Sequence, residues 1–590
     1  MEHLAERTCC MARLTNREVA AKFDLIADLL QIRGDNIFRI NSYRNAAQTI
    51  RDLPRDLYAI QAEGRLTELP DIGGAIAAKI EELLTTGEIK FLKELAEEVP
   101  VSLAELLQIN GVGPKKVKLF WEELGITTID QLKAAAEAGQ LQKLSGMGKK
   151  SEQKILEGIA ALANRTNRIS IGVALPIALQ ILNDLLQMPQ VIKGDIAGSL
   201  RRRRATIGDI DILVAAEDAA PIMDAFVSRS DVGRVLGHGP TKSSIELVQG
   251  LQADLRVLPP ERYGTALSYF TGSQAHNIRL RELALKQGLS LNEHAFTKTD
   301  GSNEEILCAT EAEVYEVLGL PWIPPELRED RGEIEAALRG ELPTLITESD
   351  ICGDLHMHTT WSDGKNSIEE MVTAAKERGL QYVVITDHSQ SLGIANGLSV
   401  ERLLAQQAEI RRINALMGED FHILHGTEME IRADGTLDYP DEILAQLDFV
   451  IASLHVGLRQ ERDQITKRIL NAIQNPHVDM IGHLRGRLIP EREGADMDID
   501  AILASAAKHG TILEINANPR RLDLDESHAR HAQDLGVRLA INTDAHDTAQ
   551  LDVMHFGVSN ARRGWIRPET VINTQDASQF LNWLSARNHL

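Results

Sequence analysis

Two aspartates with one residue between them lie in a short apolar stretch, IGDIDILVAA, whose pattern predicts a β-strand. Side chains two residues apart on a strand point to the same face, so Asp209 and Asp211 would project together. A third carboxylate, Asp254 in QADLRVLP, could come from a neighbouring strand. Three convergent carboxylates can hold two Mg²⁺ ions, one that activates an attacking hydroxyl group and one that binds a triphosphate. The alternative is an acidic pair that merely faces solvent.

A glycine turn precedes this acidic pair. Gly198 and Ser199 open the stretch GSLRRRRATIGDID, in which four arginines follow. The backbone N–H groups and the serine hydroxyl of such a turn can cradle phosphate, and an arginine such as Arg202 can neutralise its charge. A GS pair followed by GDxD is typical of nucleotidyltransferases and is far more specific than a lone DxD. The combination therefore predicts a site that transfers a nucleotide.

The C-terminal part of the chain is rich in histidine, with fourteen of the 18 histidines after residue 350. Six predicted strands there end in a potential metal ligand, as in DLHMHTTWSDG, QYVVITDH and RLAINTDAHD. The carboxyl ends of the strands in a parallel α/β barrel open on one face, so these ligands would converge. The converging residues are His356, His358, Asp363, His388, Glu428, His455, His483, Asp544 and His546.

This set of nitrogen and oxygen donors contains no cysteine and suits two or three ions such as Zn²⁺ or Mn²⁺. Glu428 is the natural choice for a carboxylate that bridges two of them. A cluster of this kind can activate water and neutralise a phosphate group under attack. Other histidines of the region are better explained as surface or core residues: His422, His425, His477, His509, His528 and His555.

The elements that must position these residues change in character along the chain. The first 165 residues predict short helices, residues 170–320 predict strands and helices, and apolar strands alternate with helices after residue 350. The last pattern favours a parallel sheet or barrel. A proline-rich, charged stretch before it predicts an interdomain linker. No apolar run is long enough for a membrane span and the start lacks a signal-peptide core, so we expect a cytoplasmic protein.

Charge and cysteine content limit the partners. A net charge of −23 argues at first against nucleic acid, because phosphate binding needs a basic surface. The acidic residues are unevenly distributed, however: residues 1–170 carry 23 basic and 24 acidic side chains, whereas residues 346–590 carry 23 basic and 37 acidic side chains. The near-neutral front can still present a basic face, and an acidic, histidine-rich tail suits metal ions. The four cysteines form no CxxC pair, which argues against a disulfide framework or a thiolate metal site.

Three similar phrases recur in the helical front: LPDIGGAIAAKI, LQINGVGPKKVKLF and LQKLSGMGKKSEQKIL. Each has an apolar run, a glycine turn and then a helix with basic residues near its start, which resembles a helix-hairpin-helix motif. Glycine permits close backbone approach, and N–H groups at a helix start can hold a DNA phosphate without reading sequence. A packing role is an equal alternative for the third phrase. The residues predicted to bind DNA are Gly73, Gly111, Gly113, Lys115 and Lys116.

Residues 262–296 contain the phrases YFTGS, HN and GLSLNE, which resemble the nucleotide-binding thumb of family X DNA polymerases. This resemblance implies that Tyr269, Phe270 and Gly272 line the sugar pocket and that Asn277 contacts the incoming base. The order of the domains matches bacterial family X polymerases that carry a C-terminal phosphoesterase domain.

The front of the chain shares this resemblance. FRINSYRNAAQTI resembles the small N-terminal domain that removes 5′-deoxyribose phosphate in some members, and Lys79 matches their Schiff-base lysine. A solvated Lys79 that grips phosphate is the competing interpretation. Three positions depart from vertebrate members: Ala75 replaces a phosphate-binding lysine, Gln274 replaces a commonly acidic residue, and Arg203 replaces glycine.

The tail, with its HxH, DH, E, H, H and DxH motifs, closely resembles the polymerase and histidinol phosphatase (PHP) family over about 240 residues. The resemblance implies a distorted seven-stranded (β/α)7 barrel with a trinuclear metal site that hydrolyses phosphoesters.

The predicted architecture is therefore multidomain, with α+β and α/β parts. Its predicted divisions are residues 1–92 (helical DNA-binding or lyase-like domain with a helix-hairpin-helix), 93–166 (second helix-hairpin-helix, fingers-like region), 167–258 (nucleotidyltransferase palm), 259–322 (nucleotide-binding thumb), 323–350 (linker) and 351–590 (PHP phosphoesterase domain).

Together the resemblances imply a DNA-directed DNA polymerase that fills short gaps in base excision repair. Its partners would be gapped or primer–template DNA and dNTPs, with Mg²⁺ or Mn²⁺ at the polymerase site, and the tail would be a Mn²⁺-dependent 3′–5′ exonuclease or 3′-end phosphoesterase. Two alternatives stay open: a PHP domain that is only a metal-stabilised scaffold, and a 3′-end hydrolase whose polymerase half only positions DNA. We expect a nucleoid-associated protein with no membrane contact, and nothing in the sequence demands more than a monomer.

Overall fold

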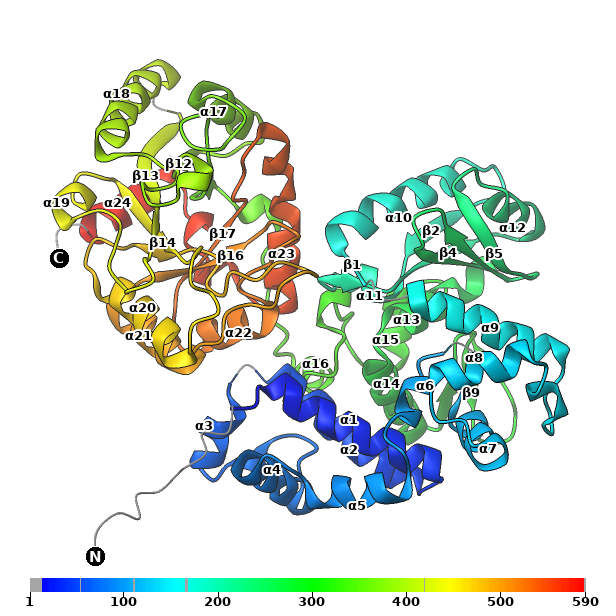
Figure 1. The fold of residues 1–590 in the computed structure, drawn as a ribbon. Helices are drawn as coiled ribbons and strands as arrows, with labels where there is room; N and C mark the ends of the chain where they lie inside the picture. The colour runs from blue at the N-terminus through cyan, green and yellow to red at the C-terminus, as the bar shows by residue number, and fades with distance from the viewer. Residues whose placement is uncertain (1–12, 54, 110–111, 165–167, 419, 588–590) are drawn as a thin grey trace, which may run out of the picture. The chain divides into compact units, whose positions relative to one another are not determined.

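The computed structural model describes residues 13–53, 55–109, 112–164, 168–418 and 420–587. The chain divides into two compact units, residues 1–167 and residues 168–590 (Figure 1). Within its described residues the first unit consists of helices and loops around one apolar core. Its α-helices are α1 (Asn16–Arg33), α2 (Ile37–Asp52), α3 (Leu57–Ala62), α4 (Gly74–Thr86), α5 (Lys90–Glu98), α6 (Leu103–Leu106), α7 (Pro114–Leu124), α8 (Ile129–Glu137) and α9 (Lys149–Asn164).

Local sequence sets the ends of the first helix. Thr15 and Glu18 form a capping box that satisfies free N–H groups at the start of α1. Gly34 ends the helix in the left-handed conformation, which glycine adopts without steric cost. Between these ends, Phe23 and Leu30 are fully buried, so the helix is held by its apolar face.

The second unit begins with a mixed sheet in the order β2-β4-β7-β6-β5, in which β4 and β7 are parallel and the other neighbours antiparallel. Along β4, Ile210 and Ile212 enter the core covered by α10 and α12, whereas Leu213 packs under α13. Strand alternation places Asp211 on the same face as Leu213. The elements are β1 (Ile169–Ser170), α10 (Ile171–Leu186), β2 (Lys193–Ile196), α11 (Gly198–Arg201), β3 (Thr206–Ile207), β4 (Asp209–Ala215), α12 (Ala220–Val227), β5 (Val232–His238), β6 (Lys242–Leu247) and β7 (Gln252–Leu258).

Helices and a small antiparallel sheet follow this mixed sheet. Gly272 and Ser273 separate α13 from α14, and the Ser273 hydroxyl accepts from the His276 N–H at the start of α14. The elements are α13 (Tyr263–Thr271), α14 (Gln274–Lys286), β8 (Leu289–Leu291), β9 (Phe296–Lys298), β10 (Glu305–Ile306) and α15 (Glu311–Val317).

Residues 323–350, predicted as a linker, connect this region to the barrel, and several of their side chains are buried, among them Leu327, Glu333 and Ala337. Arg328 is fully buried. Glu329 accepts from Arg202 at 3.1 Å and from Arg563 at 3.0 Å, so one carboxylate connects residues 167–258, the predicted palm, to a helix of the barrel. A buried charge that loses its partner is costly, and this network therefore fixes the segment in place.

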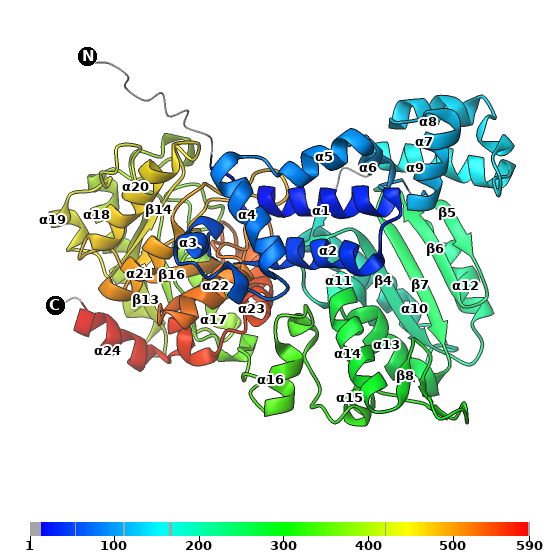
Figure 2. The same cartoon turned by 90° about the horizontal axis from the view of Figure 1, so that it is seen from below.

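The rest of the unit is a parallel sheet of seven strands in chain order, β11 to β17. A parallel bridge between Met357 and Ala545 joins the ends of the first and last strands, so the sheet nearly closes into a barrel, with helices around it (Figure 2). The strands are β11 (Gly353–Asp354), β12 (Tyr382–Ile385), β13 (His422–Glu430), β14 (Phe449–Ser453), β15 (Met480–Ile481), β16 (Ile512–Asn516) and β17 (Leu539–Asn542).

The α-helices of the linker segment and barrel are α16 (Glu333–Arg339), α17 (Ile368–Glu377), α18 (Val400–Met417), α19 (Asp441–Leu444), α20 (Arg462–Gln474), α21 (Ile499–His509), α22 (Glu526–Asp534), α23 (Met554–Arg563) and α24 (Ala577–Arg587). Barrel strands such as YVVI of β12 and FVIAS of β14 are buried throughout, as expected for a parallel sheet covered by helices. Across the described residues, no helix combines the length and apolar character needed to cross a membrane.

Candidate active sites

The mixed sheet brings three aspartates together. Asp211 on β4 and Asp254 on β7 are register partners on neighbouring parallel strands, so their side chains leave the same face of the sheet. Asp209 precedes Asp211 by two residues and shares that face. Gly198 lies against this aspartate triad: its φ is +61°, and a Cβ atom there would overlap with Asp211 Oδ2. Only glycine fits, and the glycine turn therefore contacts the carboxylate directly.

The aspartate triad concentrates negative charge. Burial, together with the Asp209 and Asp254 carboxylates, raises the pKa of Asp211 to about 7. Lys242 Nζ lies 2.6 Å from Asp254 Oδ2, and Gln252 Nε2 donates to the other oxygen of that carboxylate at 2.8 Å. Close carboxylates repel one another, so a cation between them would relieve the repulsion. The donors are all oxygen, which fits a hard divalent cation such as Mg²⁺.

Metal binding at the aspartate triad is expected to weaken below neutral pH. Because its pKa is about 7, the Asp211 carboxyl group holds a proton that must leave before a cation can bind its oxygen. The affinity for Mn²⁺ should therefore be about tenfold lower at about pH 6 than at about pH 8. Calorimetric titration of the protein, minus the same titration of Asp211→Asn, isolates this site from other metal ligands. Equal affinities at the two pH values would contradict the expectation.

The residues predicted to contact a nucleotide lie around the turn between α13 and α14. Asn277 Nδ2 donates to the Tyr269 carbonyl oxygen at 2.6 Å. Gly272 is so close to Asn277 that a Cβ atom on the glycine would lie 2.6 Å from Oδ1. The Arg256 guanidinium lies 4.0 Å from the centre of the Phe270 ring, which connects this turn to β7. The four predicted residues thus form one packed group next to the strand that carries Asp254.

The two remaining predicted phosphate contacts lie in and just after α11. Ser199 is half-buried in that short helix. Arg202 donates to Glu329 and, at 2.7 Å, to the Thr271 carbonyl oxygen. Arg202 thus connects the end of α11 to α13 and to the segment 323–350. Its contact with a triphosphate stays a prediction.

In the helical unit, two of the predicted glycine turns leave their backbone open. Gly73 is the N-cap of α4 and Gly113 is the N-cap of α7, and a Cβ atom at either position would meet nothing within 4 Å. The backbone there is accessible to a ligand rather than packed against protein. Lys115 is exposed two residues after Gly113, and Lys116 is half-buried. Gly111 lies outside the described residues.

Lys79 lies on α4 of the same unit. Its Nζ donates to the Ala75 carbonyl oxygen at 3.2 Å and lies 5.5 Å from the centre of the Phe91 ring. A Schiff base and a phosphate contact both remain compatible with this half-buried amine.

The nine predicted ligands of the barrel converge where its strands end. Ligand atoms of His358, Asp363, His388 and His546 lie within 4.8 Å of one another. The same holds for two groups that share Glu428, namely His356 with His358, and His388 with His455. His483 Nε2 is 2.8 Å from Glu428 Oε1, and Asp544 Oδ1 is 3.1 Å from His358 Nε2. These nine residues, called the histidine cluster below, form one connected group.

The histidine cluster has the unsatisfied atoms that bound cations would use. Glu428 Oε2 lies 2.8 Å from His388 Nδ1 and Oε1 lies 2.8 Å from His483 Nε2, yet neither carboxylate oxygen has a hydrogen-bond partner. Buried ring nitrogens of His356 and His358 also lack one. Leaving such atoms buried and unpaired is costly in free energy. Their convergence on Glu428 fits a site for more than one metal ion.

Two members of the histidine cluster already have the charge state that binds a cation, whereas His455 and His546 must first lose a proton, because neighbouring carboxylates outweigh burial and raise the pKa of each to about 9. Burial, with the neighbouring rings of His546 and His388, lowers the pKa of His358 to about 3, so this ligand is neutral. Burial would raise the pKa of Glu428, but the histidines led by His455 outweigh it and hold that pKa well below its usual value. An ionised carboxylate and a neutral imidazole are the forms that bind metal.

Two acidic residues that sequence analysis missed hold the ligands from behind. Glu514 on β16 accepts from His356 Nδ1 at 2.8 Å, and Glu430 on β13 accepts from His455 Nδ1 at 2.7 Å. Each contact leaves the second ring nitrogen directed to the cluster, a common arrangement in metal sites. A signal was present: Glu430 shares a strand face with Glu428, and Glu514 lies between Leu513 and Ile515 in a buried strand, where a charge needs a partner.

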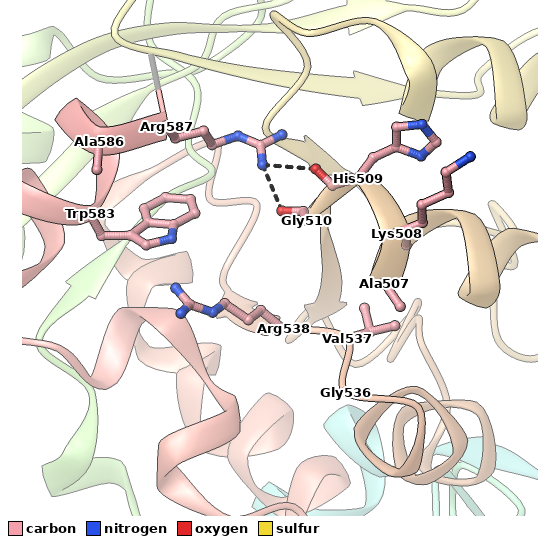
Figure 3. Close-up of a pocket in the computed structure, with 11 residues that line it drawn as sticks. Ala507, Lys508, His509, Gly510, Gly536, Val537, Arg538, Trp583, Ala586 and Arg587 are labelled. Atoms are coloured by element: carbon pink, nitrogen blue, oxygen red, sulfur yellow. Dashed lines mark hydrogen bonds between the residues drawn. The ribbon is translucent and has the colours of Figure 1, made fainter. Parts of the chain in front are cut away.

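A separate pocket lies at the other end of the barrel, where β16 and β17 begin (Figure 3). Its volume is about 550 Å³, and none of its lining residues belongs to the histidine cluster. Arg587 donates to the Gly510 carbonyl oxygen at 2.7 Å and closes one wall. The basic and aromatic residues of the lining are Lys508, His509, Arg538, Trp583 and Arg587.

An aspartate triad lies against a glycine turn, and the barrel that follows gathers nine side chains that could hold metal ions. This combination is that of a nucleotidyltransferase joined to a phosphoesterase domain. Four protein-family models match the chain in a corresponding order. They are the helix-hairpin-helix domain (residues 14–89), the SAM-like helix-hairpin-helix tandem (103–161), the DNA polymerase beta thumb (266–329) and the PHP domain (354–518).

Comparison with curated proteins shows the family. Over 570 residues the chain is 40% identical to the DNA polymerase/3′-5′ exonuclease PolX of Bacillus subtilis (strain 168), covering 96% of this chain and 99% of that protein. It is 24% identical to DNA polymerase lambda of Rattus norvegicus over 349 residues, 53% of this chain and 56% of that one. A probable phosphatase of Thermoanaerobacter sp. (strain X514) is 32% identical over 245 residues, 40% of this chain and 94% of that protein.

The chain therefore belongs to the bacterial family X DNA polymerases with a C-terminal PHP domain. The predicted fold class is confirmed by the helix-hairpin-helix, thumb and PHP matches and by the nearly closed seven-stranded parallel barrel.

Proposed function

We propose that this chain is a DNA-directed DNA polymerase that fills short gaps during DNA repair, using gapped or primer–template DNA and dNTPs. The observation that carries this proposal is the register of Asp211 and Asp254 on adjacent parallel strands, with Asp209 beside them. Mg²⁺ or Mn²⁺ bound there would activate the primer 3′-hydroxyl and neutralise the triphosphate. The carboxylates would hold the cations, the turn at Gly198 would offer N–H groups to phosphate, and Asn277 would contact the incoming base.

We propose that the barrel is a 3′–5′ exonuclease or 3′-end phosphoesterase with two or three Zn²⁺ or Mn²⁺ ions. The ions would supply an activated water and offset the charge of the attacked phosphate. Glu428 would bridge them, while Glu514 and Glu430 orient the ligand rings. The histidine cluster can be reached from solvent, because the Asp363 and His546 side chains are 34% and 28% exposed. An opening for a substrate argues against the alternative in which the barrel is only a scaffold.

Three finer assignments belong to the same proposal. The domain divisions are proposed after residues 92, 166, 258, 322 and 350; the helix-hairpin-helix and PHP matches fall within the proposed domains, whereas the thumb match extends to residue 329, beyond the proposed division after 322. Lys79, next to the Phe91 ring, is proposed as a Schiff-base lysine for removal of 5′-deoxyribose phosphate, with a phosphate contact as its alternative. A monomer suffices for both sites, because the described residues of one chain supply the aspartate triad and the histidine cluster.

One gapped duplex tests both activities. With dNTPs and Mg²⁺ or Mn²⁺, the protein should extend the primer into the gap, and without dNTPs it should shorten the 3′ end. Metal analysis of the same preparation should find two or three ions per chain, about the number that a cluster of this kind holds. Absence of extension would contradict the polymerase proposal. If protein loaded with metal leaves the 3′ end intact, the result would favour the alternative in which the PHP domain is only a metal-stabilised scaffold.

DNA affinity is expected to fall when Lys115 is replaced by alanine. Lys115 is exposed beside the open turn at Gly113, where it can neutralise one phosphate. The slope of log K against log salt should therefore drop by about one unit, with little dependence on DNA sequence. Fluorescence anisotropy with gapped duplex at several salt concentrations measures this. The matched control is Lys133→Ala, which removes an exposed lysine on α8 and should leave the slope unchanged.

A further inference from the structure

An arginine that no part of the proposed mechanism uses lies beside the histidine cluster. Arg521 Nε is 3.4 Å from Asp544 Oδ2, and its side chain is 19% exposed. The residue lies in the loop between β16, which ends at Asn516, and α22, which begins at Glu526. This position puts a guanidinium at an accessible edge of the cluster, on a loop at the end of a barrel strand.

The charge of Arg521 has one partner in the cluster, and that partner is itself a proposed metal ligand. Asp544 Oδ2 also accepts from Asn516 Nδ2 at 3.1 Å. When Asp544 shares its charge with bound cations, Arg521 loses part of its counter-charge next to positive ions. An incoming phosphate would restore the balance, and a guanidinium offers several N–H donors in a planar arrangement that matches phosphate oxygens.

The loop that carries Arg521 is fixed from within the barrel. Arg487 Nε donates to the Arg521 carbonyl oxygen at 2.6 Å, and the same guanidinium donates to the Leu522 carbonyl oxygen. The Ile489 N–H donates to the Arg520 carbonyl oxygen at 2.6 Å. These contacts hold the backbone on both sides of Arg521, so its side chain starts from a fixed point.

The palm holds the same loop from the other side. The Ser170 hydroxyl, which caps α10, donates to the Pro519 carbonyl oxygen at 2.7 Å. Pro519 also presses on Gly172, where a Cβ atom would lie 2.5 Å from the proline Cγ. Leu522 is fully packed into the palm core. The polymerase half thus grips a loop of the barrel two residues before and one residue after Arg521.

We propose that Arg521 is a catalytic residue of the barrel that binds the phosphate group under attack, and that the palm positions it through Pro519. This inference rests on the proposed 3′-end hydrolysis and deepens it. It gives the polymerase half a mechanical part in hydrolysis that is separate from holding DNA.

Replacing Arg521 by alanine tests the phosphate contact. Affinity for inorganic phosphate, measured by calorimetry on Mn²⁺-loaded protein, should fall about tenfold or more, and kcat/KM for 3′-end degradation about 100-fold. Metal content should not change, Arg521→Lys should retain part of the activity, and added guanidinium should rescue the alanine variant. The matched control is Arg520→Ala, an exposed neighbour that pairs with Glu491 and should behave as the unmodified protein.

Unchanged phosphate affinity in Arg521→Ala would overturn the phosphate contact, and so would a loss of metal that accounts for the loss of activity. Failure of the proposed function has a different signature: unmodified, metal-loaded protein would degrade no 3′ end. The phosphate titration still reports on Arg521 in that case, because it requires no turnover.

Replacing Gly172 by alanine tests the palm contact with one added methyl group. The methyl group should displace Pro519 and lower 3′-end degradation about tenfold, while primer extension and metal content stay unchanged. Gly237→Ala, at a palm position where a Cβ atom meets nothing within 4 Å, is the matched control. Pro519→Gly removes the same contact from the barrel side and should give the same loss if Gly172→Ala folds poorly. Full degradation by both folded variants would overturn the positioning role.

Discussion

Replacing Asp211 by asparagine is expected to slow primer extension by about 10³-fold while leaving 3′-end degradation within about twofold of the unmodified protein. Asp211 is the centre of the aspartate triad, with Asp254 as its register partner and Gly198 packed against its carboxylate. Asparagine keeps the size of the side chain but replaces a charged oxygen by an amide group. A loss of about 10³-fold corresponds to about 4 kcal/mol of transition-state stabilisation.

Unfolding should not explain this loss. Because the pKa of Asp211 is raised to about 7, its ionised form is less favourable in the folded protein than in the unfolded chain above that pH. A neutral asparagine removes this cost, so the variant should melt at or above the temperature of the unmodified protein at about pH 8. The matched control is Glu217→Gln, an exposed residue just beyond the other end of β4. If the variant incorporates a single nucleotide at a rate within tenfold of the unmodified protein, Asp211 is not a ligand of the catalytic metal ions.

Strand alternation made part of the polymerase site predictable. The spacing of Asp209 and Asp211 is enough to place both on one face, because the side-chain period of a strand is two. The position of Asp254 was harder to predict from the sequence, because α12 and the β5–β6 pair lie between β4 and β7 in the chain. The register of two strands so far apart in sequence depends on tertiary packing. The sequence supplied the candidate strand, and the structure supplied its pairing.

The histidine cluster was predictable for a related reason. Parallel barrels collect the carboxyl ends of all strands on one face, so ligands at those ends meet without knowledge of exact register. The supporting acids do not follow from that rule. Glu514 contacts His356 across 158 residues of chain, and nothing local distinguishes it from a carboxylate that pairs elsewhere. Only the buried neighbours of each ring identify the residue that orients it.

Composition alone does not reveal how residues 323–350 are packed. Proline and charge there predict a linker, and within this segment Glu329 pairs with Arg202 and with Arg563, the latter 234 residues away. Charged residues are mostly exposed unless they are paired, and pairing is a property of the folded chain. The same network includes Arg202, which donates to Glu329 and to the Thr271 carbonyl oxygen, while its predicted contact with a triphosphate stays a prediction.

Replacing Glu428 by glutamine should abolish 3′-end degradation and leave primer extension unchanged. Glu428 lies within ion-pair distance of His388, His455 and His483, and both of its oxygens are buried without a hydrogen-bond partner. Glutamine offers one neutral oxygen where two charged oxygens can bridge cations. Metal affinity should fall by more than the 10–100-fold typical of supporting residues, and degradation by about 10³-fold.

The measurements are metal content after dialysis and the rate of 3′-end shortening on a single-stranded substrate. The matched control is Glu442→Gln on α19, which removes an exposed carboxylate from the same barrel and should change neither quantity. A Glu428→Gln protein that keeps its metal and still degrades DNA would show that the bridging carboxylate is dispensable. A protein that loses metal and also loses synthesis would instead favour the scaffold interpretation, because the barrel would then support the palm through contacts such as Glu329–Arg563.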